Sequence, residues 1–61
     1  MPEIIIELAQ GRSIEQKRAL AKGITQVVVE TCNTTADQVT VIIHETPLTD
    51  KAKGGVLFAD R

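Results

Sequence analysis

The feature that most constrains this chain is the spacing of two short β-branched apolar runs around a single helical segment. Residues 4–8 (IIIEL) form the first run and residues 39–43 (VTVII) form the second. Between them, helical periodicity is present in one segment only, which begins near Ser13 and ends at residues 33–35. A strand, a helix and a second strand form a βαβ unit, in which the strands are parallel and the crossover is right-handed.

The start of the helix is marked by a capping box. Ser13 and Gln16 have the spacing at which each side chain satisfies the other residue's free backbone amide, so the helix is expected to begin at Ser13. Gly23 is a poor helix former inside this segment, at a cost of about 1 kcal/mol. Apolar residues recur at helical spacing along one stripe, at Leu20, Ile24, Val27 and Val28.

The segments after the helix are short. Residues 35–38 fit a single helical turn capped by Thr35, and residues 46–53 read as a polar loop. Two glycines, Gly54 and Gly55, then form a turn before a terminal edge strand at residues 56–58. The sequence therefore predicts one α+β domain over residues 1–61, with two parallel strands, one long helix and a short C-terminal hairpin strand.

Such a small domain needs partners. A chain of 61 residues removes only about 60% of its unfolded surface from water. One cysteine cannot close an intrachain disulfide, and one cysteine with one histidine is too few for a tetrahedral zinc site. Both strands are nearly continuous apolar runs, which is typical of a sheet covered on both faces, whereas a single helix covers one face. We expect a homo-oligomer; the alternative is a poorly soluble monomer.

Composition excludes several classes of function. A net charge of -1 leaves no basic surface for nucleic acid, and Phe58 is the only aromatic residue on which a base could stack. The chain has no apolar segment long enough to cross a membrane and no cationic leader, so a cytoplasmic protein is expected. His44 is interpreted as structural or exposed, because nothing near it in sequence orients it, and Cys32 as a small core residue.

Pro2 and Arg12 are the candidate catalytic and anion-binding residues of the sequence. Removal of Met1 would leave Pro2 as a secondary amine, which is both a base and a nucleophile, whereas the simpler interpretation is that Pro2 starts an edge strand. Arg12 lies in the turn after the first strand and ahead of a helix N-terminus, and both features suit an anion. An arginine in a loop is otherwise usually solvated.

In order and spacing, these motifs resemble the 4-oxalocrotonate tautomerase family of the tautomerase superfamily. The resemblance rests on the Met-Pro-x-Ile start, residues 11–17 (GRSIEQK), residues 41–45 (VIIHE) and the glycine pair. It implies a β-α-β subunit assembled as a hexamer, with no metal or organic cofactor. It further implies that Pro2 is the catalytic base for keto-enol proton transfer on 2-hydroxymuconate-type acids. Arg12 would bind the distal carboxylate of this small-molecule substrate.

Two positions depart from the family pattern. Thr40 stands where the family has a second arginine, and Lys51 stands where an aromatic residue lines the pocket. Thr40 can donate one hydrogen bond to the substrate but carries no charge. Lys51 either restores a cation to the substrate-binding site or is a solvated loop residue. Two alternatives therefore remain: a non-catalytic oligomerising or companion subunit whose hetero-oligomeric partner supplies the arginine, and water addition to an unsaturated acid.

Overall fold

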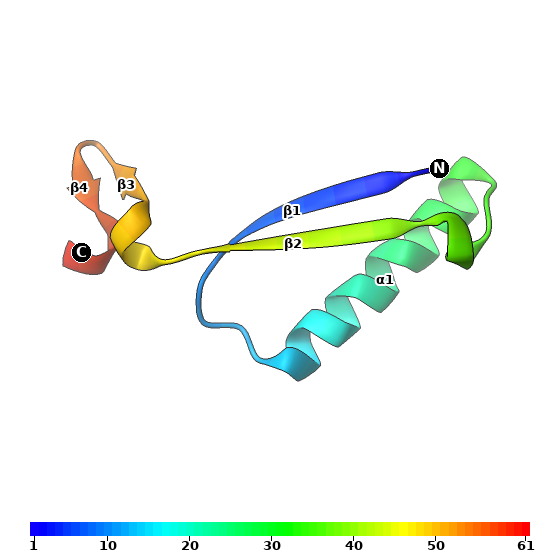
Figure 1. Cartoon of the computed structure of the whole chain (residues 1–61), viewed down its shortest axis with the longest axis horizontal. Helices are drawn as coiled ribbons and strands as arrows, with labels where there is room; N and C mark the ends of the chain where they lie inside the picture. The colour runs from blue at the N-terminus through cyan, green and yellow to red at the C-terminus, as the bar shows by residue number, and fades with distance from the viewer.

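The computed structural model describes all 61 residues and contains the expected βαβ unit (Figure 1). Strand β1 spans Glu3–Ala9, helix α1 spans Ile14–Cys32, and strand β2 spans Thr40–Thr46. The two strands are parallel, in a register that runs from Glu3 opposite Thr40 to Ala9 opposite Thr46. Both strands are longer than expected, because backbone pairing continues through Glu3 and Ala9 in β1 and through residues 44–46 in β2.

Both ends of α1 are fixed by local hydrogen bonds. The backbone N–H of Gln16 donates to the Ser13 hydroxyl over 3.1 Å, and the backbone N–H of Ser13 donates to Gln16 Oε1 over 2.9 Å, which confirms the capping box. Asn33 ends the helix in the left-handed conformation at φ 53°. The expected cap at Thr35 is wrong in one respect: its hydroxyl donates to the Asp37 carboxylate and not to the backbone.

The two faces of the sheet differ. One face carries half-buried residues toward α1, including Ile4, Ile6, Val41 and Ile43. On the other face Ile5 is 58% exposed, and the pairs Glu3–Thr40 and Glu7–His44 lie on either side of it in the register. The expectation of two apolar faces is therefore only partly correct, because the face away from α1 alternates apolar and polar residues.

The subunit has no closed core of its own. None of its 61 residues is buried, and its accessible surface is 4643 Å², against about 3,900 Å² for a compact chain of this mass. Its radius of gyration is 14.6 Å, against about 10.5 Å for a compact domain of this length. Cys32, expected in the core, is exposed at the last position of α1. These values favour a subunit that completes its packing against other chains.

Residues 47–61 form an arm that extends from the end of β2, away from the rest of the subunit (Figure 1). The polar loop expected at residues 46–53 is more ordered than predicted, since it contains a 3-10 turn at Leu48–Asp50 and strand β3 at Ala52–Lys53. Strand β3 pairs antiparallel with β4, Val56–Leu57. The turn between them needs glycine, because φ is 61° at Gly54 and 83° at Gly55.

Candidate active site

Pro2 lies immediately before β1, at the N-terminal end of the parallel pair. Its carbonyl oxygen accepts a hydrogen bond from the backbone N–H of Thr40 over 3.0 Å, and its side chain is half-buried. Met1, which precedes it, is 92% exposed. The fold therefore brings Thr40 beside Pro2, and the residue bonded to the proline nitrogen is exposed.

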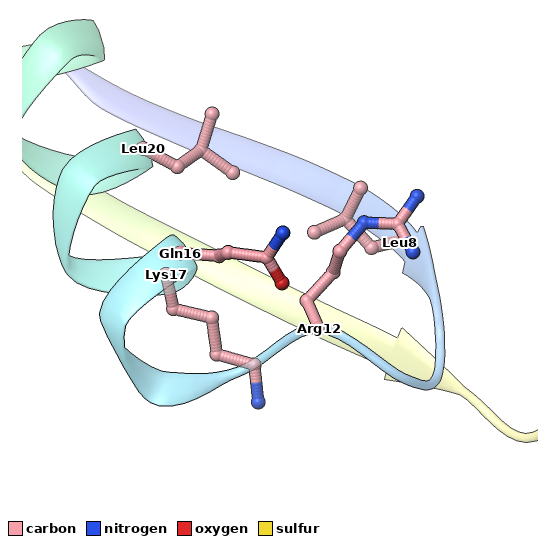
Figure 2. Close-up of a pocket in the computed structure, with 5 residues that line it drawn as sticks. All are labelled: Leu8, Arg12, Gln16, Lys17 and Leu20. Carbon is pink, nitrogen blue, oxygen red and sulfur yellow. The ribbon is translucent and has the colours of Figure 1, made fainter.

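Arg12 lies at the opposite end of β1, in a pocket of 260 Å³ between the strand and the first turns of α1 (Figure 2). The pocket is lined by Leu8, Arg12, Gln16, Lys17 and Leu20. Arg12 directly precedes Ser13, the N-cap, and takes no part in either ion pair of the structure or in any side-chain hydrogen bond. Its guanidinium group is therefore free to bind an anion.

The second cation of this pocket is already engaged. Lys17 forms an ion pair and a hydrogen bond with Glu45 of β2. The hydrogen bond from Lys17 holds the pKa of the Glu45 carboxyl below its usual range, and the positive charge of Lys17 and the backbone of Gly11 act in the same direction. Arg12 is thus the unpaired cation of the pocket.

Within one subunit, Pro2 and Arg12 are not brought together. They lie at opposite ends of β1, a strand of 7 residues, and a strand rises about 3.3 Å per residue. The two residues are therefore separated by roughly 20 Å, several times the length of a small carboxylic acid. A site that uses both residues has to combine Pro2 of one copy with Arg12 of another.

Lys51 lies in a third place, on the arm. Its ammonium group sits 4.9 Å from the centre of the Phe58 ring, and the Arg61 guanidinium lies 5.3 Å from the same ring. The backbone N–H of Phe58 donates to the Lys51 carbonyl over 2.8 Å. Lys51 is half-buried, and its role as a cation of the substrate site stays a prediction.

The basic residues of the chain are unevenly distributed along its length. Residues 1–11 and 23–43 contain no lysine or arginine, and neither the last turn of α1 nor the short helix at Ala36–Gln38 has a basic residue. These segments include Pro2, Thr40 and the C-terminal part of α1. The Pro2 end of the subunit therefore provides no cation of its own for a carboxylate substrate.

One polar pair was missed by the sequence reasoning. His44 Nδ1 lies 2.8 Å from Glu7 Oε1 on the sheet face away from α1, and the side chains are 61% and 66% exposed. Of the two interpretations of His44, structural or exposed, the exposed one is confirmed, but Glu7, which is remote in sequence, does orient its ring. The parallel register, in which Glu7 is opposite His44, was the signal that could have revealed the pair.

Comparison with known proteins agrees with this architecture. The model of the tautomerase enzyme family matches residues 2–61. A probable tautomerase of Bradyrhizobium diazoefficiens is 44% identical over 61 residues, which cover 100% of this chain and 91% of the relative. A probable tautomerase of Streptococcus pneumoniae is 45% identical over 47 residues, which cover 77% of this chain and 78% of the relative.

Solved structures show the same fold. A crystal structure of a 4-oxalocrotonate tautomerase homologue superposes with a TM-score of 0.95 at 33% identity, covering 100% of this chain and 97% of the other. A heterohexameric 4-oxalocrotonate tautomerase from Chloroflexus aurantiacus superposes with a TM-score of 0.90 at 32% identity, covering 98% and 97%. From the family match along nearly its whole length and from these relatives, the chain belongs to the tautomerase family.

Proposed function

We propose that this protein is a proline-dependent isomerase that catalyses keto-enol proton transfer on a small unsaturated 2-hydroxy or 2-keto acid. The observation that carries the proposal is the position of Pro2, which is half-buried directly before β1 and bonded at its nitrogen to an exposed Met1. With Met1 removed, the secondary amine accepts a proton from the substrate. It then returns that proton to another carbon of the conjugated system, so the reaction needs no external oxidant, reductant or cofactor.

Arg12 is proposed as the carboxylate anchor. It is unpaired, it lies in a pocket with apolar walls, and a guanidinium group binds a carboxylate in a bidentate manner. Binding at Arg12 also draws electron density away from the reacting carbon atoms. Because Arg12 lies far from Pro2 in the same chain, the anchor comes from a neighbouring copy in a homo-oligomer, which we propose to be a hexamer.

Thr40 and Lys51 are proposed to line the remainder of the substrate site. Thr40 is held beside Pro2 by its backbone hydrogen bond, and its hydroxyl can donate to the substrate carbonyl. Lys51 is carried by an arm that projects from its own subunit (Figure 1). In an assembly this arm can reach the site of a neighbouring copy. We place the activity in the reducing cytoplasm, in keeping with the single free cysteine.

A second candidate function is a non-catalytic companion subunit. It is favoured by the absence of lysine and arginine from residues 1–11 and 23–43, which leaves the Pro2 end without a charged donor. The Chloroflexus aurantiacus relative is a heterohexamer, so a second gene product that supplies an arginine is compatible with this fold. Such a subunit would show no ketonisation activity as a purified chain.

The two functions are separated by assaying Met1-free protein for ketonisation of phenylenolpyruvate and 2-hydroxymuconate beside Pro2→Ala. Mass spectrometry of the protein from its native host establishes whether Met1 is removed. General base catalysis contributes about a hundredfold to ten-thousandfold, and Pro2→Ala should lose a factor in this range. The Pro2 carbonyl that accepts from Thr40 is kept in this variant, so the fold is preserved. Equal rates for both proteins would contradict a requirement for the secondary amine of Pro2, because the Met1-free alanine variant keeps a primary amine at the same place.

A further inference from the structure

The Pro2 end of the subunit carries acidic side chains and no basic ones. Glu3 is the first residue of β1, Glu30 lies in the last turn of α1, and Asp37 lies in the short helix that precedes β2. These segments meet at one end of the subunit, where the C-terminal part of α1 and the start of β2 lie beside the start of β1 (Figure 1). None of the three contains a lysine or an arginine. The amino terminus is therefore the only positive group that this end of the subunit supplies.

Glu3 is the one carboxylate of this end that has no partner. The Asp37 carboxylate accepts a hydrogen bond from the Thr35 hydroxyl over 2.6 Å. The Glu30 carboxylate accepts one from the Gln26 amide over 3.4 Å. Glu3 is exposed and takes part in neither ion pair of the structure and in no side-chain hydrogen bond. Its negative charge is therefore not offset by any group of its own subunit.

Glu3 shares its face of the sheet with Thr40. The two residues are register partners in β1 and β2, and neighbouring strands lie about 4.8 Å apart. Side chains of such partners point to the same side of the sheet, and both of these residues are exposed. A substrate group that accepts a hydrogen bond from the Thr40 hydroxyl therefore lies close to the Glu3 carboxylate.

We propose that Glu3 restricts the site to substrates with a single carboxylate, a refinement that rests on the proposed function. The carboxylate of such a substrate binds Arg12, the unpaired cation of its pocket, and the end that reaches Thr40 is uncharged. A dicarboxylate would set its second carboxylate beside Glu3, where no lysine or arginine offsets the repulsion between like charges. The substrate class is therefore a small unsaturated monocarboxylic acid.

Lys51 is the competing source of a positive charge for a second carboxylate. Its ammonium group lies 4.9 Å from the centre of the Phe58 ring, a contact that holds it on its own arm. A lysine that only lines the site affects both classes of acid alike. A lysine that binds the second carboxylate affects the dicarboxylate alone, so Lys51→Ala distinguishes the two roles.

Salt gives the repulsion by Glu3 a measurable signature. Because Glu3 is exposed, its interaction with a substrate charge is screened by ions, over a length of about 10 Å at 0.1 M salt and about 3 Å at 1 M. Discrimination against a dicarboxylate should therefore weaken as salt is added. A site that excludes the second carboxylate by shape alone would keep the same discrimination at every salt concentration.

Steady-state kinetics with 2-hydroxymuconate and its 6-methyl ester test the proposal, because the ester keeps the carbon skeleton and both carbonyl groups but has one negative charge fewer. Wild type should have the higher kcat/KM for the ester. In Glu3→Gln, kcat/KM for the diacid relative to the ester should rise about threefold or more, since like charges roughly 6 Å apart repel by about this factor even in water.

The matched control is Glu7→Gln, which changes the net charge equally on the same sheet face. It lies four residues further along β1, or about 13 Å away, and should change the ratio by less than about 1.5-fold. The ratio is measured because any effect of Glu3 on the Pro2 amine acts on both substrates alike. Lys51→Ala should leave the ratio unchanged, and the gain in Glu3→Gln should shrink between 0.1 M and 1 M salt.

Failure of this inference differs from failure of the proposed function. An active, Pro2-dependent isomerase whose ratio is unchanged in Glu3→Gln, or changes equally in Glu7→Gln, would overturn the role of Glu3 and leave the function standing. A wild type that prefers the diacid, or a loss confined to the diacid in Lys51→Ala, would have the same consequence. A protein inactive toward both the diacid and the ester would reject the proposed function, and the inference with it.

Discussion

The backbone N–H of Thr40 donates to the carbonyl oxygen of Pro2 over 3.0 Å, and this hydrogen bond joins the start of β2 to the start of β1. It places the backbone of Thr40, which is remote from Pro2 in sequence, beside the candidate base. The bond uses backbone atoms on both sides. Either side chain can therefore be changed without loss of the contact, which makes this pair suitable for substitution.

Replacing Thr40 by arginine should raise the activity of the protein on a dicarboxylate substrate. A charged hydrogen bond to a bound carboxylate is worth about 1.5 to 3 kcal/mol, so kcat/KM for 2-hydroxymuconate should rise about tenfold to a hundredfold. Thr40→Val is the control, since it removes the hydroxyl without adding a charge and should lower the rate or leave it unchanged. A gain with Thr40→Val, or none with Thr40→Arg, would contradict the role given to this position.

Replacing Arg12 by alanine should weaken turnover without weakening the fold. Arg12 takes part in no ion pair or side-chain hydrogen bond within the subunit, so the free energy of unfolding should change by less than about 0.5 kcal/mol. We expect kcat/KM to fall about tenfold to a hundredfold, with a smaller loss in Arg12→Lys, which keeps the charge but not the bidentate geometry. Arg18→Ala, on the exposed side of α1, should retain wild-type kinetics.

The ion pair between Lys17 and Glu45 should make a contribution to the stability of the fold that is lost in acid. The hydrogen bond from Lys17 lowers the pKa of Glu45 in the folded state, so the ionised carboxylate favours folding. This contribution is complete above the pKa of the unfolded chain and is lost as pH falls through the folded pKa. The difference in urea midpoint between wild type and Glu45→Gln should therefore shrink from neutral pH into the acidic range. A constant difference over that range would contradict this interpretation.

Local signals predicted the elements of the fold well. The capping box at Ser13 and Gln16 and the two β-branched runs each depend on neighbours within a few residues, and the structure confirms the helix start and the parallel pair. Strand ends were less predictable, because pairing across the sheet extends β2 to Thr46. Cys32 was expected in the core because cysteine is a residue type that is often buried. Its exposure depends instead on where the apolar stripe of α1 ends.

Contacts across the chain could not be predicted from local pattern. The Glu7–His44 pair depends on strand register, and the cluster of Lys51 and Arg61 on Phe58 depends on how the arm folds back on itself. The distance between Pro2 and Arg12 likewise follows from strand length and direction. Sequence identified both residues, but only the fold shows that they are separated within one subunit.

The proposed function depends most on a site shared between copies, and mixing two inactive variants tests such a site directly. Pro2→Ala and Arg12→Ala should each show greatly reduced ketonisation alone. Co-refolded in equal amounts, they should recover about one quarter of wild-type activity, because a quarter of the shared sites then combine an intact Pro2 with an intact Arg12 from another copy. A mixture no more active than its two components would contradict a site built from two subunits.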